Sequence, residues 1–464
     1  MGQFKQRSPI ATSASELYAW HLRPGAFERL TPPWQSVRIA RRDAVFGEGA
    51  RVELRIGPGP LAVRWVALHE DFVEGRSFVD RQESGPFAAW RHQHSCLPEP
   101  DGTCTLEDAL EFRLPLEPPG RWFGGWLFDR MLAQMFRFRH VRTARDIAAH
   151  AAFADRPRLT VAVTGATGLV GKALCAYLAT AGHTVRPMVC RDLEPTFPAS
   201  GSPIRWSAAD ETVEEGGFDD VDVVIHLAGA NVGQRWTPEA RQQILDSRVK
   251  GTRAIANALV RASARPRVFL CASAIGYYGN DEDEAGVDET APPGEGFLPD
   301  VVTRWEAAAQ PAVDAGIRTA FLRIGVVLSP QGGALQRMLT PFSMGVGGRV
   351  GSGRQWLSWI GLDDVLGATE YLMHHDDLEG PFNLTAPHPV RQLEFARTLG
   401  RVLRRPTIFP VPAFVLKALF GAMSEVVLEG MRVAPSRLLA HGYRFVEPDL
   451  EGLLRFELGR PGRG

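Results

Sequence analysis

The clearest hydrophobic pattern in this chain lies between residues 159 and 192. Residues 159–163 form a short apolar run that is rich in β-branched side chains, which is typical of a buried strand. Apolar residues then recur every three or four positions over residues 169–181, which predicts an amphipathic helix. Gly182 ends that helix, and residues 184–189 form a second strand. The order of strand, turn, helix and strand predicts one βαβ unit of a dinucleotide fold.

A glycine-rich turn joins the first predicted strand to the helix. Gly165 permits a tight turn, Gly168 allows the backbone to approach a pyrophosphate, and Gly171 lets the helix pack closely on the strand. The start of the helix offers free N–H groups and the positive end of its dipole to phosphates. The alternative is a turn with a structural role only. The candidate cofactor-binding residues of this turn are Gly165, Thr167, Gly168, Leu169, Val170 and Gly171.

Residues 1–150 follow a different pattern. A short helix is expected at residues 13–22, and alternating polar and apolar segments separated by Gly-Pro and Asp-Gly turns predict an antiparallel sheet. Its strands are expected at residues 37–40, 51–56, 61–68, 77–82, 90–96 and 103–114. Residues 121–150 read as one long helix with an apolar stripe, which is either core or the wall of a ligand site. The stripe consists of Phe123, Trp126, Leu127, Met131, Met135 and Phe138. His92 and His94 share one face of the sheet, where they would polarise a ligand, but two histidines alone do not predict a metal site.

Strands and helices alternate again beyond residue 200. The buried strand that begins at Val223 ends in small residues, which leave room for the sugar and phosphates of a cofactor. Leu227, Ala228, Gly229 and Ala230 are therefore further cofactor-binding candidates. Helices are expected at residues 241–262 and 301–315, and strands at residues 268–272 and 319–327. This alternation predicts an α/β fold with a doubly wound parallel sheet.

Composition narrows the class of protein. A chain of 464 residues is too long for one ordinary domain, and 45% hydrophobic with 23% charged residues is typical of a soluble globular protein. A net charge of −1 does not favour nucleic acid or an anionic membrane as a partner. No run of 18 apolar residues and no apolar signal-peptide core is present, so we expect no membrane span. The 5 cysteines lack metal-site spacing and are expected to be reduced thiols in a cytoplasmic protein.

Several ordered motifs resemble those of one enzyme family. Residues 158–455 resemble an extended short-chain dehydrogenase/reductase, more narrowly the atypical "NAD-dependent epimerase" subfamily with a small C-terminal domain. Residues 1–150 resemble a START-like, or polyketide cyclase-like, helix-grip domain that holds an apolar ligand between sheet and helix. The resemblance implies a Rossmann-like domain at 158–404 and a small substrate-side domain at 405–464. The motifs are TGATGLVG at 164–171, HLAGANV at 226–232, SRVKGT at 247–252, SAIGYYG at 273–279, WEAAA at 305–309, RIGVVLS at 323–329 and GSGRQWLSWIGLDD at 351–364.

The end of the second strand bears on the choice of cofactor. In this fold a carboxylate at that position binds the ribose hydroxyls of NAD, whereas an arginine accommodates the 2′-phosphate of NADP. Arg191 stands there, with Asp192 one place later. A guanidinium pairs bidentately with a phosphate, so we expect NADP, with NAD as the alternative. The other interpretation of Arg191 is a solvated surface residue.

The catalytic pattern of the family is incomplete. None of the 6 tyrosines is followed four residues later by lysine, and alignment on Trp305-Glu306 puts Leu298 and Val302 where tyrosine and lysine belong. Arg248 replaces the family's asparagine, and would replace the lysine if the fold brought it against a tyrosine. The candidate catalytic residues are Ser273, Tyr277, Tyr278 and Arg248, each with a structural role as the alternative.

Two functions are compatible with these observations. The first is an NADP(H)-dependent oxidoreductase or epimerase-like enzyme that acts on a small molecule, with a fused apolar-ligand domain. The glycine-rich loop at residues 345–359 is expected to line the substrate site. The second is a non-catalytic NADP(H)-binding sensor, which the missing Tyr-x-x-x-Lys pattern favours.

Overall fold

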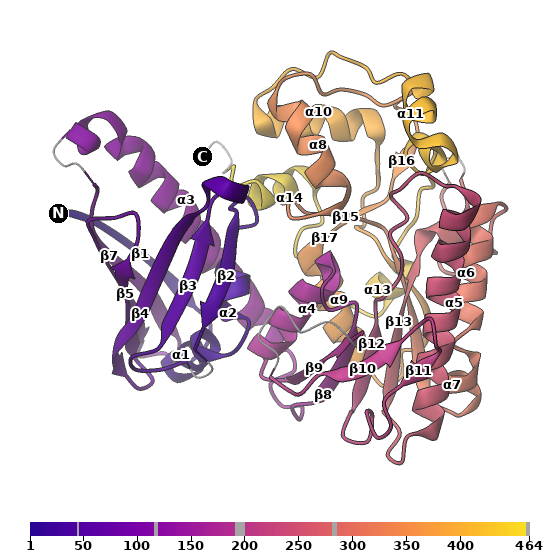
Figure 1. Ribbon diagram of the computed structural model, residues 1–464, viewed down its shortest axis with the longest axis horizontal. Coiled ribbons are helices and arrows are strands. Elements are labelled where there is room, and N and C mark those ends of the chain that lie inside the picture. Colours follow the sequence, from indigo (N-terminus) through magenta and orange to yellow (C-terminus); the bar gives the residue numbers. More distant parts are fainter. Residues whose placement is uncertain (44–45, 116–118, 191–199, 281–284, 461–464) are drawn as a thin grey trace. The chain divides into compact units, whose positions relative to one another are not determined.

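The computed structural model describes residues 1–43, 46–115, 119–190, 200–280 and 285–460. The chain divides into two compact units, which are coloured along the sequence in Figure 1. The N-terminal unit consists of Met1–Ala154, Thr180–Gly182 and the chain from Glu457 onward. The C-terminal unit consists of Asp155–Ala179 and His183–Phe456. The expected boundaries of three domains, at 1–150, 158–404 and 405–464, stay a prediction.

An antiparallel sheet forms the body of the N-terminal unit. Its seven strands lie in the order β1-β7-β6-β5-β4-β3-β2, and the long helix α3 packs against it (Figure 1). The strands are β1 (Gly2–Ile10), β2 (Val37–Arg42), β3 (Arg51–Ile56), β4 (Val63–Val73), β5 (Ser77–Ser84), β6 (Ala89–Pro98) and β7 (Cys104–Arg113). The helices are α1 (Ala14–Leu22), α2 (Ala26–Leu30) and α3 (Pro119–Ala151). The sheet with a long final helix that the sequence predicts is confirmed.

Helix α3 turns only part of the predicted stripe toward the sheet. Its packing follows Phe128, Leu132 and Phe136, which recur every four residues, and the Phe136 ring stacks on Phe4 of β1 at 5.1 Å. Half of the predicted stripe is therefore wrong, because Trp126, Leu127 and Met131 are exposed. The helix carries two apolar rows, and the sequence does not say which one meets the sheet. The side chain of Phe123 lies outside the described residues.

A mostly parallel sheet organises the C-terminal unit. Its strand order is β11-β10-β9-β8-β12-β13-β14-β18, with every pair parallel except β10 and β11. The order reverses between β8 and β12, as in a doubly wound fold. The strands are β8 (Thr160–Thr164), β9 (Thr184–Val189), β10 (Ile204–Ser207), β11 (Thr212–Val213), β12 (Val223–His226), β13 (Val268–Ala274), β14 (Arg318–Ile324) and β18 (Gly380–Leu384). Two small sheets pair β15 (Val326–Leu328) with β17 (Trp359–Gly361) and β16 (Trp356–Leu357) with β19 (Val390–Arg391).

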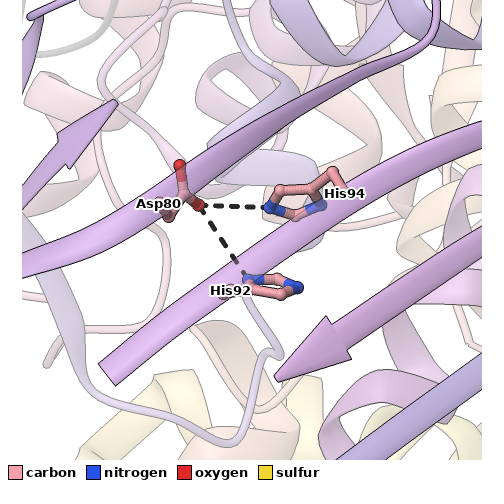
Figure 2. A group of neighbouring side chains, drawn as sticks. All are labelled: Asp80, His92 and His94. Atoms are coloured by element: carbon pink, nitrogen blue, oxygen red, sulfur yellow. Dashed lines mark hydrogen bonds and ion pairs between the residues drawn. The ribbon is translucent and has the colours of Figure 1, made fainter. Parts of the chain in front are cut away.

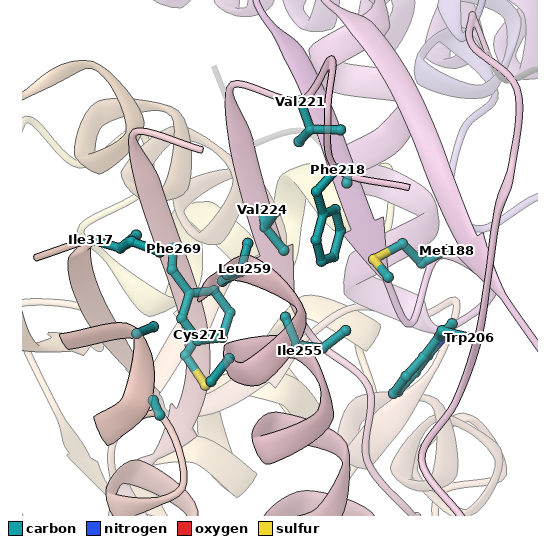
Figure 3. Packing of buried hydrophobic residues seen from close by; sticks show 14 of the residues in the cluster. Met188, Trp206, Phe218, Val221, Val224, Ile255, Leu259, Phe269, Cys271 and Ile317 are labelled. Atoms are coloured by element: carbon teal, nitrogen blue, oxygen red, sulfur yellow. The ribbon is translucent and has the colours of Figure 1, made fainter. Parts of the chain in front are cut away.

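Helices cover both faces of this sheet (Figure 1). On one face, Ile255 and Leu259 of α5 and Trp305 of α6 pack on Val224 and Phe269 of the strands, a core shown in part in Figure 3. Helices α4 and α9 lie on the other face. The helices after α3 are α4 (Leu169–Thr180), α5 (Pro238–Arg261), α6 (Phe297–Ala307), α7 (Gln310–Asp314), α8 (Gly333–Ser343), α9 (Leu362–His374), α10 (Gln392–Leu403), α11 (Ala413–Phe420), α12 (Glu425–Leu428), α13 (Ser436–Ala440) and α14 (Leu450–Glu457).

Two predicted elements are each divided in two. The helix expected at 301–315 begins earlier and breaks between α6 and α7, because Pro311 lacks the N–H that would continue the ladder. The strand expected at 319–327 breaks at Gly325, where a Cβ would come within 2.5 Å of the Ser358 carbonyl oxygen. The chain therefore leaves the main sheet there, and β15 pairs with β17 instead.

Two further expectations concern the described residues as a whole. Among them, every helix is too short or too polar to span a bilayer. All five cysteines are free thiols, and Cys175 and Cys271 are buried in the core as predicted.

Candidate cofactor and active site

The glycine turn lies at the carboxyl end of β8, against the end of β12. Gly165 has a φ of 68°, and a Cβ there would come within 2.9 Å of the Leu227 carbonyl carbon. A Cβ on Gly171 would overlap the carbonyl oxygen of Gly165. A Cβ on Gly168 would meet one atom only, the Gly165 oxygen at 3.2 Å. The first and third glycines thus close the turn, and the second leaves space in front of the N-terminus of α4.

Thr164 joins this turn to the loop after β12. Its Oγ1 accepts hydrogen bonds from the backbone N–H groups of Leu227 at 2.9 Å and Ala228 at 3.1 Å. It also lies 2.8 Å from Nδ1 of His226. Burial, helped by the nearby Arg248, lowers the pKa of His226 to about 3, so the ring is neutral and Nδ1 accepts the Thr164 hydrogen. One hydroxyl therefore fixes the two loops that form the predicted cofactor cradle.

Arg248 stabilises the same loop after β12. Its Nη1 donates to the carbonyl oxygens of Ala230 at 3.0 Å and Ile244 at 3.2 Å, and its guanidinium lies 4.9 Å from the centre of the Trp305 ring. A Cβ on Gly229 would lie 3.2 Å from the Arg248 Cζ. Burial lowers the pKa of Arg248 to about 10, which leaves it charged at neutral pH. Among the described residues, no carboxylate forms an ion pair with it.

A second polar group lies on the three strands that follow. Ser273 of β13 pairs in register with Arg323 of β14, which pairs with Asn383 of β18. Arg323 binds both carboxylate oxygens of Glu306 at 2.9 Å, and Ser273 Oγ donates to the same carboxylate at 2.5 Å. Because the strands are parallel, this row stands near the carboxyl edge of the sheet that also carries the glycine turn.

The two tyrosines after β13 are held by this row. Arg323 Nη1 donates to the Tyr278 hydroxyl at 2.9 Å, and that hydroxyl donates to Asn383 Oδ1 at 2.7 Å. Burial raises the pKa of Tyr278 to about 12 despite the adjacent Arg323. The guanidinium carbon also lies 3.5 Å from the centre of the half-buried Tyr277 ring. Tyr278 is therefore a protonated phenol whose hydroxyl is engaged on both sides.

The predicted histidines of the N-terminal unit lie together on β6, as Figure 2 shows. His92 and His94 are buried between the carboxylates of Asp80 and Asp108. Burial opposes a charge on His94, but Asp108 and Asp80 outweigh it and raise the pKa of His94 to about 9. Burial and the charge on His94 lower the pKa of His92 to about 4. In this arrangement His94 carries the positive charge between the carboxylates.

Comparison with known proteins bears on both units. Residues 161–384 match the NAD dependent epimerase/dehydratase family, residues 411–457 match domain of unknown function DUF1731, and residues 10–136 match polyketide cyclase / dehydrase and lipid transport domains. The chain is 40% identical over 304 residues to epimerase family protein Mb2239 of Mycobacterium bovis, which spans 65% of this chain and 98% of the relative. This chain belongs to the epimerase family. It is also 35% identical over 293 residues to epimerase family protein YfhF of Bacillus subtilis, over 63% of this chain and 96% of the relative.

Two solved epimerase-family structures are similar to this one. The nucleoside-diphosphate sugar epimerase from Corynebacterium glutamicum has a TM-score of 0.80 and 29% identity, over 98% of this chain and 90% of that chain. Human epimerase family protein SDR39U1, solved with NADPH, has a TM-score of 0.58 and 32% identity, over 65% of this chain and 99% of that chain. The Rossmann-like and helix-grip architecture expected from the sequence is thus shown.

Within the epimerase-family domain, the structure brings together some of the predicted site residues. The glycine turn meets Leu227 and Ala228, and Ser273 joins Tyr278 through Glu306 and Arg323. The arginine that contacts both tyrosines is Arg323, whereas the contacts of Arg248 are with the loop after β12 and Trp305. Arg191 lies outside the described residues.

Sequence reasoning missed Glu306, Arg323 and Asn383 as members of the site. Glu306 and Arg323 stand inside two of the motifs that carry the family resemblance, WEAAA and RIGVVLS. A usable signal was therefore present for Arg323, since it lies in a predicted strand of a doubly wound fold. The position of the missing tyrosine is filled by Leu298, which packs with Trp236 and Val301 in an apolar cluster, and Val302 is buried.

Proposed function

We propose that this epimerase-family protein is an NADP(H)-dependent oxidoreductase or epimerase that acts on a small molecule. The proposal rests on one observation: the carboxyl edge of the parallel sheet carries both a glycine turn, called the cradle here, and a row of polar side chains. The cradle consists of Gly165, Gly168 and Gly171, and the row consists of Ser273, Arg323 and Asn383. Ligands of doubly wound folds bind at this edge, beside the point where the strand order reverses.

The cradle suits a dinucleotide. Gly168 leaves space before the N-terminus of α4, where backbone N–H groups and the helix dipole favour a pyrophosphate. The charge of Arg248, which forms no ion pair within the described part of the chain, lies next to Gly229 and adds to the attraction of an anion. A nicotinamide bound there would supply or accept the hydride. The preference for NADP rests on Arg191, and the NADPH found with the human relative supports it.

The candidate catalytic residues take different roles in this proposal. Arg248 stabilises negative charge that develops on the reacting oxygen, because it is the one of the two arginines without a carboxylate partner among the described residues. Arg323 is neutralised by Glu306 and serves with Ser273 as a positioning residue. Tyr277 offers a half-buried hydroxyl to the substrate, whereas Tyr278 is engaged with Arg323 and Asn383.

Single-turnover hydride transfer tests the proposal. Oxidation of bound NADPH is followed with a panel of carbonyl and enone substrates, which accept a hydride, and reduction of bound NADP⁺ is followed with nucleotide sugars, whose hydroxyl groups donate one. Arg248→Ala is expected to lower the rate by about 100-fold or more, and by more than Tyr277→Phe or Tyr278→Phe. NADPH affinity is measured for each variant, so that loss of binding is separated from loss of chemistry. A Tyr278→Phe variant that loses all turnover while Arg248→Ala retains it would contradict this assignment of roles.

A non-catalytic NADP(H)-binding module is the second candidate. It is favoured by the apolar residues Leu298 and Val302 in the place of the family's tyrosine and lysine. It predicts tight NADPH binding in calorimetry with no hydride transfer to or from the cofactor for any member of the panel. Turnover of one substrate rules this candidate out.

We also propose an apolar ligand for the N-terminal unit. Aromatic rings gather between its sheet and α3, with the ring centres of Trp65 and Trp90 5.0 Å apart and those of Phe87 and Phe128 5.7 Å apart. The match to polyketide cyclase and lipid transport domains supports this use. A long-chain fatty acid is the probe, and quenching of tryptophan fluorescence is the readout. Unchanged fluorescence up to the solubility limit of the probe would contradict binding at these rings.

A further inference from the structure

Three neighbouring strands of the N-terminal unit bring two histidines and two aspartates to one place. His92 and His94 lie on β6 and point to the same side, because side chains two apart share a face of a strand. Asp80 of β5 is the register partner of His92, and Asp108 of β7 is the register partner of His94. All except Asp80 are almost completely buried, and Asp80 retains 24% of its side-chain exposure.

We infer that Asp80, His92 and His94 form a binding site for a divalent transition-metal ion, with Zn²⁺ as the first choice. The candidate ligand atoms are Asp80 Oδ2, His92 Nδ1 and His94 Nε2. The Asp80 oxygen lies 3.1 Å from the His94 nitrogen and 4.0 Å from the His92 nitrogen, and all three atoms lie within 4.8 Å of one another (Figure 2). Ligands of tetrahedral zinc lie about 3.3 Å apart, so the ion needs small side-chain adjustments only.

The opposite nitrogens of both imidazoles face a single carboxylate. His92 Nε2 lies 3.1 Å from Asp108 Oδ1, and His94 Nδ1 lies 2.8 Å from the same oxygen. His140 of α3 contacts the other oxygen, Oδ2, at 3.0 Å. Metal-binding histidines almost always direct their second nitrogen to such a partner. His92 does so through a hydrogen bond to Asp108, whereas His94 Nδ1 lies close to the same carboxylate without a hydrogen bond. The ion would replace the proton that His94 Nε2 directs at Asp80. Asp108 therefore serves as the outer carboxylate of a carboxylate–histidine–metal arrangement.

The donor set indicates the class of ion. Two imidazole nitrogens and one carboxylate oxygen suit Zn²⁺, Co²⁺ or Ni²⁺ and leave one or more coordination positions open. A divalent ion would also balance the charges of the Asp80 and Asp108 carboxylates. The partial exposure of Asp80 gives the ion a route from solvent.

A second cluster of similar composition lacks this arrangement. His183, Glu370 and His374 of the C-terminal unit also lie close together. There, however, His183 Nδ1 accepts a hydrogen bond from the backbone N–H of Leu159 at 3.0 Å, which places the ring proton on Nε2, the nitrogen that faces Glu370. This cluster therefore supplies a matched control.

Metal titration of the full-length protein tests the inference. The protein is treated with a chelator and desalted, and Zn²⁺ or Co²⁺ alone is then added. We expect about one equivalent of Zn²⁺ bound with a Kd below about 1 µM, and an intense visible spectrum with Co²⁺ from four- or five-coordinate metal. Less than a tenth of an equivalent of either ion on the wild-type protein would overturn the site without reference to any variant.

Variants locate the ion. His94→Gln and Asp80→Asn are expected to weaken binding by roughly 100-fold or more, and Asp108→Asn by about 10- to 100-fold, because the last removes only the outer carboxylate. His374→Gln in the second cluster is expected to bind as the wild type does. Near-ultraviolet circular dichroism of each metal-free variant shows whether it is folded. An undiminished equivalent on folded His94→Gln, or its loss in His374→Gln, would place the ion elsewhere and overturn the inference.

Discussion

Nη1 of Arg323 donates a hydrogen bond to the hydroxyl of Tyr278 at 2.9 Å, inside a folded core where Tyr278 is 4% exposed. The hydroxyl in turn donates a hydrogen bond to Oδ1 of Asn383. These two hydrogen bonds link β14 and β18 to the turn that follows β13. Tyr278 therefore has a structural role, and the effect of its substitution on stability can be measured apart from any effect on catalysis.

The first prediction compares the two tyrosines. Tyr278→Phe leaves a donor on Arg323 and an acceptor on Asn383 buried without their partner, so we expect the free energy of unfolding to fall by about 1–3 kcal/mol. Tyr277→Phe removes a hydroxyl that has no hydrogen-bond partner among the described residues, and a change within about 0.5 kcal/mol is expected. Urea unfolding of the full chain measures both. Equal losses for the two variants would show that the network does not carry this energy.

The second prediction concerns Gly171. Its replacement by alanine would overlap the carbonyl oxygen of Gly165, and backbone cannot move aside as a flexible side chain does. We expect Gly171→Ala to abolish NADPH binding in calorimetry or to yield no folded protein. Gly251→Ala, also in a helix of this unit, meets its neighbours at 3.5 Å or more and is the control. If Gly171→Ala binds NADPH as the wild type does, the close packing of α4 on the turn is not required.

Arg191 carries the third prediction. A charge-assisted contact contributes about 1.5–3 kcal/mol, so Arg191→Ala should weaken NADPH binding by roughly 10- to 100-fold. NADH lacks the 2′-phosphate and should bind with little change. Calorimetry with both cofactors measures the difference. An equal loss of affinity for NADPH and NADH would exclude Arg191 as the residue that binds the 2′-phosphate.

The fourth prediction concerns acid. The pKa of His226 is lowered to about 3 in the folded chain, below its ordinary value near 6.5. The unfolded chain therefore binds this proton first as pH falls below about 6.5, and the stabilisation by the neutral ring is lost progressively down to about pH 3. Between pH 7 and pH 5 the loss amounts to about 2 kcal/mol from this group. Urea unfolding at the two pH values checks it. His226→Gln removes the ionisable group and should show a shallower dependence; an identical slope would contradict the assignment.

Local sequence patterns predict much of the fold, but they do not predict the polar row of Ser273, Arg323 and Asn383. The βαβ unit, the glycine turn and β3 follow from residues adjacent in sequence, and they were predicted with correct or nearly correct bounds. The row of Ser273, Arg323 and Asn383 depends on the register between strands 50 and 60 positions apart, as the residue numbers show. No local period encodes such a register. The same reason explains why half of the predicted stripe on α3 is wrong, because only the sheet opposite decides which apolar side chains of the helix are covered.

The charge of Arg248, which has no carboxylate partner among the described residues, has a thermodynamic consequence. A cation removed from water without a carboxylate partner is costly to the folded state, and an anion that binds above Gly229 repays part of that cost. Because such an anion binds the folded chain and not the unfolded one, it raises stability with its concentration, by about 2.7 kcal/mol at 100 times its Kd. The melting temperature of this protein is therefore a property of the chain and its anions together, and values measured in phosphate and in chloride buffers describe two different equilibria.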